Sequence, residues 1–573
     1  MDTRRAILWV IFSLSLLMLW DAYMRHTGQG SMFGTGVSTS NTTSQSGAGS
    51  SETAGAATNA GVPASTGAAL PTPTTAVNGG APNATPVTGT PAPSGDRVIL
   101  KNKDIELEID VVGARIVRAK LLTQESEAYP DGRVTLFDQS PERKYEAQTG
   151  LIGAAGSATN FPNHTTTFKR VLGKDGAIGS DRQTTLAAES GGLKLNKSFA
   201  LEPEGYLIKV SHTVQNTGAD SLTPLVYLQL MRDGDRAPGE SKFYQTFIGP
   251  AIYTEEGKFQ KIDFSDVEKN KASHVKSANN GWLGIVQHYF VAAWVPKNDV
   301  SREFYTRKVD NNLYSVGMIQ PLATIAPGAQ LNHEATLFAG PQLQRTLEQL
   351  APGLDLVVDY GWLTFLAQPI YWLLEKLHGI VANWGWAIVL LTIIIKLIFY
   401  PLSAASYKSM AKMKAVSPRL MKLREVYAND KAKLNQAMME MYKTEKINPL
   451  GGCLPVVIQI PVFLALYWVL LASVEMRNAP WIGWINDLSV PDPYFILPVV
   501  MAITMFIQTK LNPPPPDPIQ AKVMMFMPIV FSVFFFFFPA GLVLYWLVNN
   551  LISIAQQWFV MRQVAQRGAL KKA

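Results

Sequence analysis

Apolar and polar residues follow two different rhythms along this 573-residue chain. Long apolar runs lie at the extreme N-terminus and again after residue 360, whereas residues 97–341 place apolar side chains at every second position, as in Ile105, Leu107, Ile109 and Val111. Runs of span length predict transmembrane helices, and alternation between turn-forming clusters predicts an antiparallel β-sandwich. The pattern therefore predicts a helical membrane protein that carries an all-β domain.

Five apolar segments after residue 380 are candidate membrane spans, and Ala6–Trp20 near the N-terminus makes a sixth. Segments of 15 or 16 residues rise only about 23 Å as helices, against a hydrocarbon core of about 30 Å. Because short spans are accommodated by a thinner bilayer or by association, we expect local thinning. The five segments form a predicted core at 381–560 and are Val381–Tyr400, Leu454–Leu471, Tyr494–Gln508, Val523–Phe538 and Leu542–Val560.

Residues 361–378 precede this core and place Trp362, Phe365, Ile370 and Leu377 at helical spacing. The stretch is rich in Trp, Tyr and Leu, and Pro369 is expected to interrupt it. We predict an amphipathic helix that lies in the membrane interface. A short membrane span is the alternative.

The N-terminal 96 residues predict an anchor followed by a linker. In residues 1–27 two arginines precede an apolar run, which resembles a secretory signal. No small-residue cleavage pattern follows Trp20 directly, so we expect an uncleaved signal anchor, with a cleaved signal as the alternative. Residues 28–96 are almost entirely Gly, Ser, Thr, Ala, Asn and Pro, a composition that predicts disorder.

The charges of the loops predict the orientation in the membrane. Residues 401–447 carry ten Lys or Arg against four acidic residues, residues 472–493 carry three acidic residues against one Arg, and the tail 561–573 is basic. Because Lys and Arg collect in cytoplasmic loops, both termini and the 401–447 loop should be cytoplasmic. The predicted fold class is a polytopic α-helical protein with six transmembrane helices, in the bacterial inner membrane, with a periplasmic all-β domain.

The 401–447 loop should itself fold into a helical hairpin, because apolar residues recur in it every three or four positions on both sides of Asn429 and Asp430. Its outer surface would be basic. It is either a docking surface for an anionic partner such as ribosomal RNA, or a solvated hairpin that only obeys the charge rule for loops. The candidate docking residues are Lys408, Lys412, Lys414, Arg419, Lys422 and Arg424.

Lys396 is the only charged residue inside any candidate span. A charge at the centre of a lipid-exposed helix costs about 2.5–3.5 kcal/mol on insertion scales. Either Lys396 extends along its helix to the cytoplasmic surface, or polar groups of several spans share a hydrated cavity with it. Thr392 lies one turn earlier on the same face. The other polar candidates are Gln459, Thr504, Gln508, Ser532, Asn549 and Asn550, and the last span also holds Ser553, Gln556 and Gln557.

Covalent and metal chemistry find little support in the sequence. The single cysteine, Cys453, excludes a disulfide within one chain and any CxxC site. The seven histidines lack HExxH spacing, and no GxxxxGK[ST] phosphate loop occurs. His212 lies in an alternating run, where a packed histidine is favoured over a catalytic one. We therefore expect no cofactor and no enzymatic activity.

Several motifs closely resemble the Oxa/YidC/Alb family of membrane-protein insertases. They are NPLGGCLPVVIQIPVFLALYWVL (448–470), FPAGLVLYWLVNN (538–550), NWGWAIVLLTIIIKLIFYPL (383–402) and SYKSMAKMK (406–414). The resemblance implies a β-supersandwich related in fold to sugar mutarotases, and a five-helix core around a hydrophilic groove. It implies nascent membrane proteins as substrates. The implied partners are the lipid bilayer, SecYEG, SecDF, the ribosome and the signal-recognition-particle receptor, the last two through the basic hairpin and tail.

The resemblance also assigns residues to the groove. The family's groove charge, an Arg in many members, falls on Lys396, which keeps the charge but not the bidentate geometry. A substrate-contacting threonine falls on Thr392. The family's Tyr-Tyr pair falls on Tyr545 and Trp546, so the second hydroxyl is absent and an aromatic contact remains.

The sequence thus predicts an insertase and chaperone for inner-membrane proteins, which acts alone or with the Sec translocon. Three other classes stay open. A small-solute transporter would need a midplane site and usually internal repeats. A mutarotase-like sugar-binding protein or enzyme would need acid/base pairs in the β domain. A passive assembly scaffold would tolerate replacement of both Lys396 and Thr392.

Overall fold

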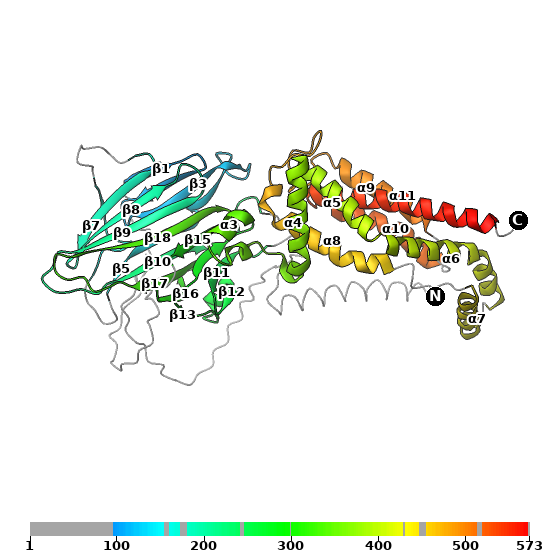
Figure 1. Ribbon diagram of the computed structural model, residues 1–573, viewed down its shortest axis with the longest axis horizontal. Coiled ribbons are helices and arrows are strands. Elements are labelled where there is room, and N and C mark those ends of the chain that lie inside the picture. Colours follow the sequence, from blue (N-terminus) through cyan, green and yellow to red (C-terminus); the bar gives the residue numbers. More distant parts are fainter. Residues whose placement is uncertain are drawn as a thin grey trace, which may run out of the picture. The chain divides into compact units, whose positions relative to one another are not determined.

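The computed structural model describes residues 96–153, 160–171, 180–240, 246–297, 300–427, 430–445, 454–512 and 518–570. The predicted anchor 1–27, the linker up to residue 95 and the end of the 401–447 loop lie outside the described residues. The chain separates into two compact units, with the boundary between Val358 and Asp359. The first is a β unit and the second a helical unit (Figure 1).

The β unit consists of two nine-stranded antiparallel sheets. The first has the strand order β1-β2-β3-β4-β5-β10-β17-β16-β13, and the second β12-β11-β14-β15-β18-β9-β8-β7-β6. The strands of the first sheet are β1 Arg97–Lys101, β2 Ile105–Asp110, β3 Arg115–Glu125, β4 Arg133–Gln139, β5 Lys144–Ile152, β10 Leu225–Asp233, β13 Ser277–Ala278, β16 Arg302–Asp310 and β17 Leu313–Pro321.

The strands of the second sheet are β6 Lys169–Arg170, β7 Gln183–Ser190, β8 Leu193–Leu201, β9 Leu207–Asn216, β11 Gly249–Thr254, β12 Lys258–Lys261, β14 Trp282–Val286, β15 Phe290–Pro296 and β18 Gln330–Pro341. The short helices are α2 Phe264–Glu268, α3 Gln344–Leu350 and η1 Leu354–Val357.

Strands of the β unit bury either alternate side chains, as β8 and β9 do, or nearly all of them, as β5, β10 and β17 do. In β8 every second residue is buried, in the pattern that the sequence predicts. Trp294 of β15 is fully buried, and its Nε1 donates to the carbonyl oxygen of Gln229 in β10 at 3.1 Å. Truncation of such a side chain to Ala costs about 3–5 kcal/mol. The predicted antiparallel β domain is confirmed; its relation to mutarotases stays a prediction.

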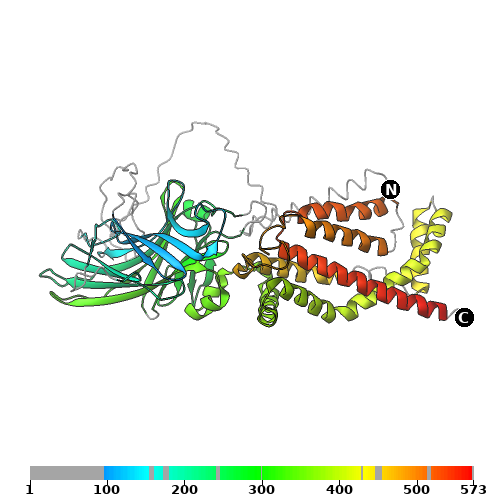
Figure 2. The ribbon, with the colours of Figure 1, turned by 90° about the horizontal axis from the view of Figure 1, so that it is seen from above.

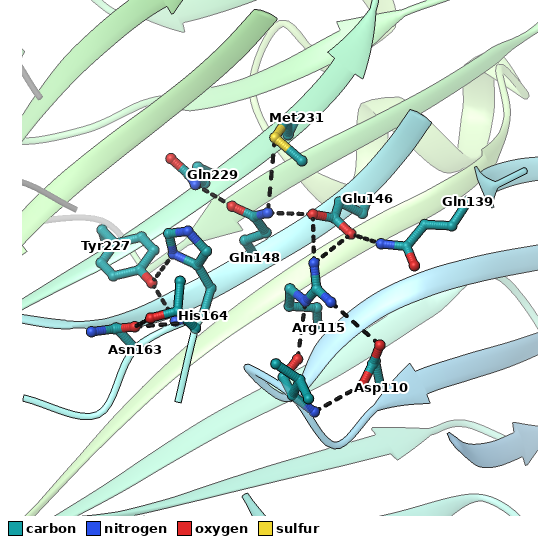
Figure 3. Close-up of polar contacts among 12 residues, drawn as sticks. Asp110, Arg115, Gln139, Glu146, Gln148, Asn163, His164, Tyr227, Gln229 and Met231 are labelled. Carbon is teal, nitrogen blue, oxygen red and sulfur yellow. Dashed lines mark hydrogen bonds and ion pairs between the residues drawn. The ribbon is translucent and has the colours of Figure 1, made fainter. Parts of the chain in front are cut away.

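A connected polar network lies inside the first sheet (Figure 3). Arg115 donates to Glu146 at 3.2 Å and to Asp110 at 3.3 Å, and all three side chains are buried. Gln148 donates to Glu146, and Gln229 donates to Gln148. A buried ion pair costs desolvation energy unless further hydrogen bonds satisfy it, and these amides supply them. The network therefore holds strands β3, β5 and β10 in register.

Glycine 317 lets this network continue across β17. Tyr305 of β16 donates to Gln229 Oε1 at 2.7 Å, over the strand that lies between them. A Cβ at Gly317 would lie 2.2 Å from the Tyr305 hydroxyl, so any other residue would displace it.

A row of basic side chains lies on the facing sheet. Lys197, His212 and His333 are direct cross-strand neighbours on β8, β9 and β18. The Lys197 ammonium donates to the carbonyl oxygens of Gly113 and Thr149, each at 2.7 Å. His212 is fully buried and bonds the Thr149 hydroxyl at 2.8 Å. The structure thus supports the packed reading of His212.

The helical unit contains η2 Gly361–Leu363, η4 Val474–Met476 and eight longer helices among the described residues. These are α4 Thr364–Val381, α5 Trp384–Ile398, α6 Tyr400–Val426, α7 Lys431–Thr444, α8 Leu454–Ala472, α9 Ile496–Leu511, α10 Pro518–Phe535 and α11 Ala540–Leu570. Helices α5 and α9–α11 run along one direction, and α4 crosses it in Figure 1 and is seen end-on in Figure 2.

Two helices differ from the sequence prediction. Helix α4 continues through Pro369, so the predicted interruption is wrong: the proline lies in the second turn and removes a single backbone bond. Helix α11 extends ten residues past the predicted span end at Val560, to Leu570.

The positions of these helices do not decide whether each one is long enough to cross a membrane. Among the described residues, no single helix is both long and apolar enough to pass as a membrane span, while α5 and α6 pass together as a pair bent by 66°. Shorter apolar helices cover Gln459–Ala472, Ile496–Leu511 and Met525–Phe535. The number of spans therefore stays a prediction.

The β unit should lose stability in acid. Burial lowers the pKa of His212 and His164 well below its ordinary value, and that of His333 to about 4. Unfolded histidine titrates at about 6.5, so the stability that neutral histidines contribute is present above that pH and is lost as the pH falls below it. At about pH 5 we expect a loss of about 2 kcal/mol for each buried histidine.

Urea titration of the full-length protein, read by pulse proteolysis of the β unit at about pH 7.5 and about pH 5, measures this loss. His333→Gln should weaken the pH dependence because it removes one of the three groups. Equal urea midpoints of the unmodified protein at the two pH values would contradict the expectation.

Candidate functional site

Helix α5 carries the two residues around which the site is built. Asn383 begins the helix as its N-cap, and its Oδ1 accepts a hydrogen bond from the backbone N–H of Trp386 at 3.1 Å. Thr392 and Lys396 follow on the same face and are 0% and 4% exposed. The Thr392 hydroxyl donates to the Ile388 carbonyl oxygen at 2.7 Å, so its polar atom is satisfied within the helix.

The ammonium of Lys396 points into the bundle. Its Nζ donates to Ser553 Oγ of α11 at 2.7 Å and to Gln459 Oε1 of α8 at 3.4 Å. Both of these partners are neutral. The side chain therefore lies against two other helices, which favours the interior position over extension along α5 to a surface.

The partners of Lys396 are themselves linked. Gln459 Nε2 donates to Asn549 Oδ1, and Ser553 Oγ donates to the Asn549 carbonyl oxygen at 2.7 Å. We call Lys396, Gln459, Asn549 and Ser553 the lysine cluster. It joins α5, α8 and α11 through polar contacts at one level of the bundle.

A second set of polar contacts joins α9 to α11. Asn550 Nδ2 donates to Thr504 Oγ1 at 3.4 Å, and Thr504 donates in turn to the Met501 carbonyl oxygen at 2.7 Å. Further along, Gln557 Nε2 donates to Asn512 Oδ1 at 3.0 Å. Polar groups in a low-dielectric interior are costly unless they are paired, and α11 pairs them with α9 and with Asn512 at its C-terminal end.

Aromatic rings pack next to the lysine cluster, one turn back along α11. Tyr545 is buried and stacks on Phe463 of α8 with centroids 6.3 Å apart. Trp546 meets Phe463 edge-on at 4.6 Å and Phe535 of α10 at 5.5 Å. Trp546 thus contacts both α8 and α10.

Three predicted site residues do not join these contacts: the first is Thr392, whose hydroxyl bonds the Ile388 carbonyl oxygen of its own helix. Ser532 is buried, but its hydroxyl donates to the Pro528 carbonyl oxygen of its own helix at 2.6 Å. Gln508 is half-buried on α9. Conversely, the sequence did not assign Ser553 to the groove. Its position could have been predicted from spacing, because Tyr545, Asn549, Ser553 and Gln557 recur every four residues and so share one face of α11.

The basic hairpin is formed by α6 and α7. Val416 and Leu420 are buried between them, against Met413, Met438, Met441 and Tyr442. Five of the six predicted docking residues are exposed and Arg424 is half-buried. Arg419 forms an ion pair with Glu445 at 2.7 Å. The exposed docking residues are Lys408, Lys412, Lys414, Arg419 and Lys422.

Two family models together cover most of the chain between residues 97 and 567. The family described as "YidC periplasmic domain" matches residues 97–373, and the one described as "60Kd inner membrane protein" matches residues 376–567. Fold and matches define the class: an inner-membrane protein with a β-rich periplasmic domain followed by a helical part.

Relatives over the whole length narrow the class to one family. "Membrane protein insertase YidC" of Cupriavidus necator is 51% identical over 570 residues, which cover 99% of this chain and 98% of the relative. The protein of the same name from Bordetella parapertussis is 51% identical and covers 99% of each. A solved structure titled as an active YidC insertase is 18% identical, covers 81% of this chain and 92% of its own, and has a TM-score of 0.38. The chain belongs to the YidC family of membrane protein insertases.

Removal of the Ser553 hydroxyl should destabilise the helical unit. In Ser553→Ala the Lys396 ammonium would keep only its longer contact with Gln459, and a buried donor that loses a partner costs about 1–3 kcal/mol. We expect a lower melting temperature of the purified protein in detergent. Lys396→Met in the same chain should recover the loss because no charge is left to satisfy.

Ser532→Ala is the matched control, because it removes a buried hydroxyl that bonds only its own helix. Equal destabilisation by Ser553→Ala and Ser532→Ala would show that the contact with Lys396 contributes nothing of its own.

Proposed function

We propose that this chain inserts nascent membrane proteins into the inner membrane through a hydrophilic groove whose wall contains the lysine cluster. Lys396 would attract acidic residues in the polar flank of the substrate. Thr392, Gln459, Thr504, Gln508, Ser532, Asn549 and Asn550 would supply the remaining polar wall, and Tyr545 and Trp546 aromatic contact with the passing helix. No covalent step is needed.

The single observation that carries this proposal is a buried ammonium with neutral hydrogen-bond partners. Ser553 and Gln459 accept hydrogen bonds from two of its three N–H donors, and neither partner carries a negative charge that would compensate it. In a medium of low dielectric constant an uncompensated charge acts over a longer range than in water. A passing carboxylate would therefore be stabilised next to Lys396 more than at the bundle surface.

The exterior of the bundle supports the second half of the proposal, in which the apolar stretch of the substrate moves along α8 and α10 into lipid. Large apolar side chains on these helices are exposed. Hydrophobic transfer, about 0.8 kcal/mol for each buried CH₂ group, would drive the step, and a thinned bilayer would shorten the path. The exposed residues are Ile460 on α8 and Met525, Phe526, Met527, Val533 and Phe534 on α10.

The same proposal assigns the arrangement in the membrane. The chain would be a multi-pass protein with six spans and cytoplasmic termini. Helix α4 would lie in the interface, which agrees with its direction across α5 and α11 (Figure 2). Its exposed apolar face would meet lipid and includes Phe365, Trp372 and Ile380, and Trp362 of the preceding η2 is exposed as well.

The hairpin α6–α7 and the tail 561–573 would dock the ribosome and the signal-recognition-particle receptor. The supporting feature is the set of exposed basic side chains of the hairpin described above, four lysines and Arg419. SecYEG and SecDF would join the same protein for substrates that need the translocon.

A catalytic β domain is disfavoured by the place of its charged groups. Asp110, Arg115 and Glu146 are 0–3% exposed and bond one another, so a sugar would not reach them without disruption of the sheet. The supersandwich and its mutarotase relation are proposals about fold alone.

Reversal of the charge at position 396 should change substrate preference. In proteoliposomes, Lys396→Glu should slow insertion of a substrate with an acidic N-terminal tail about tenfold more than that of a substrate with a neutral tail of equal length. That ratio corresponds to a difference of about 1.4 kcal/mol in the barrier. Lys396→Gln should show a smaller effect of the same direction.

Lys510→Glu is the matched control: this lysine is exposed at the end of α9, where it lies over the Phe506 ring. It should leave the ratio of the two rates unchanged. If Lys396→Glu slows both substrates equally, the electrostatic part of the proposal fails.

A further inference from the structure

One loop is bound to several helices at the end of the bundle where α5 begins. It comprises residues 473–495, between α8 and α9, and we call it the α8–α9 loop. Tyr371 of α4 donates to Glu475 of the loop at 2.8 Å. The backbone N–H groups of Ala540 and Gly541, at the start of α11, donate to the loop carbonyl oxygens of Val490 and Leu488 at 2.8 and 2.9 Å. The loop is therefore fixed before its contact with α5 is considered.

Asn383 connects this fixed loop to α5. Its Oδ1 caps the helix through the Trp386 N–H, and its Nδ2 donates to the carbonyl oxygens of Pro480 and Trp481 at 3.0 and 3.3 Å. One amide thus forms three hydrogen bonds, one to the helix and two to the loop. The first turn of α5 cannot move away from the loop while these bonds persist.

Trp481 and Gly385 add a steric contact at the same place. A Cβ at Gly385 would lie 2.2 Å from Cδ1 of Trp481, so the ring occupies space that only a glycine leaves free. Trp481 also meets the Trp386 ring edge-on, with centroids 5.8 Å apart. Rotation of α5 would replace Gly385 with a larger residue against this ring, so the contact resists rotation as well as sliding.

We propose that Asn383, with Trp481 seated on Gly385, is a clamp that positions α5 so that Lys396 meets Ser553 and Gln459. The inference rests on the proposed function, because the clamp would hold the Lys396 ammonium at the wall of the proposed groove. Asn383 touches no substrate and is a positioning residue.

The geometry of α5 explains how the clamp acts over a distance. The helix is continuous from Trp384 to Ile398, and Lys396 lies about 20 Å along its axis from Asn383 at about 1.5 Å per residue. A slip by one residue turns a helix face by about 100°. Such a slip would move the ammonium out of the lysine cluster, whereas the apolar exterior of the bundle would change little.

The test uses Asn383→Ser in the full-length protein, reconstituted in proteoliposomes with the acidic-tailed and neutral-tailed substrates. Serine keeps an oxygen that caps the helix but loses both donors to the loop. We expect the ratio of acidic to neutral insertion rates to fall several-fold, as in Lys396→Gln. Adding Asn383→Ser to Lys396→Gln should lower the ratio no further, because both changes act through one charge.

Trp484→Phe is the matched control. It removes a hydrogen bond inside the same loop, from Trp484 Nε1 to Asp492 Oδ1 at 2.9 Å, and leaves Asn383 in place. The ratio should stay at the value of the unmodified protein. Gly385→Ala is the second variant, since it displaces Trp481 with Asn383 intact, and it should lower the ratio in the same way.

The outcomes separate the inference from the proposed function. If Lys396→Gln lowers the ratio and Asn383→Ser slows both substrates equally, the clamp is merely structural and the inference is overturned, while the proposed function stands. If Lys396→Gln leaves the ratio unchanged, the electrostatic proposal fails and the clamp loses its task. Failure of both Asn383→Ser and Gly385→Ala to assemble would also overturn the inference, because the contacts would then serve folding.

Discussion

A lysine ammonium held inside a helical bundle by two neutral oxygen atoms is the constraint on which the helical unit depends. Removal of a charge from water costs several kcal/mol even after relaxation, so the oxygens of Ser553 and Gln459 must be in place. Gln459 is held by Asn549, and Ser553 by the backbone of α11. Helices α5, α8 and α11 therefore have to meet at one level, and the α8–α9 loop fixes α5 there.

The β unit also buries charged side chains. One buried set, Arg115 with Asp110 and Glu146, places a guanidinium between two carboxylates of the same sheet, so its positive charge is paired directly with negative ones. In the lysine cluster the positive charge of Lys396 has only the neutral partners Ser553 and Gln459 among the hydrogen bonds of its described side chain. Lys197 of the β unit is also an ammonium with neutral partners, the carbonyl oxygens of Gly113 and Thr149, but those oxygens belong to the backbone, whereas the partners of Lys396 are side chains.

The sequence was sufficient for the kinds of element and for the polar candidates, and insufficient for their pairing. Alternation predicted β2 and the run around His212, which is β9, and spacing placed Thr392 with Lys396 on one face. That Lys396 meets Ser553, 157 positions away, depends on how α5 packs against α11, which no local pattern contains. The extension of α11 to Leu570 was missed because the apolar run ends near Val560 while the helical pattern continues into polar residues.

Asn383 has one role that the sequence could predict and one that it could not. An asparagine before an apolar run is a recognisable N-cap, and the structure has it as one. Its two donors to the loop, 97 and 98 positions away, could not be read from the chain. The Trp481 ring against Gly385 likewise becomes visible only when the loop is in place.

The most direct measurement of the central claim uses the purified protein in liposomes and a short, ribosome-free substrate with an acidic N-terminal tail. Protease protection of that substrate, compared between proteoliposomes and protein-free liposomes, counts the inserted chains. The account predicts clearly more protected substrate with the protein present, and no dependence on added nucleotide. Equal protection in the two preparations would contradict it.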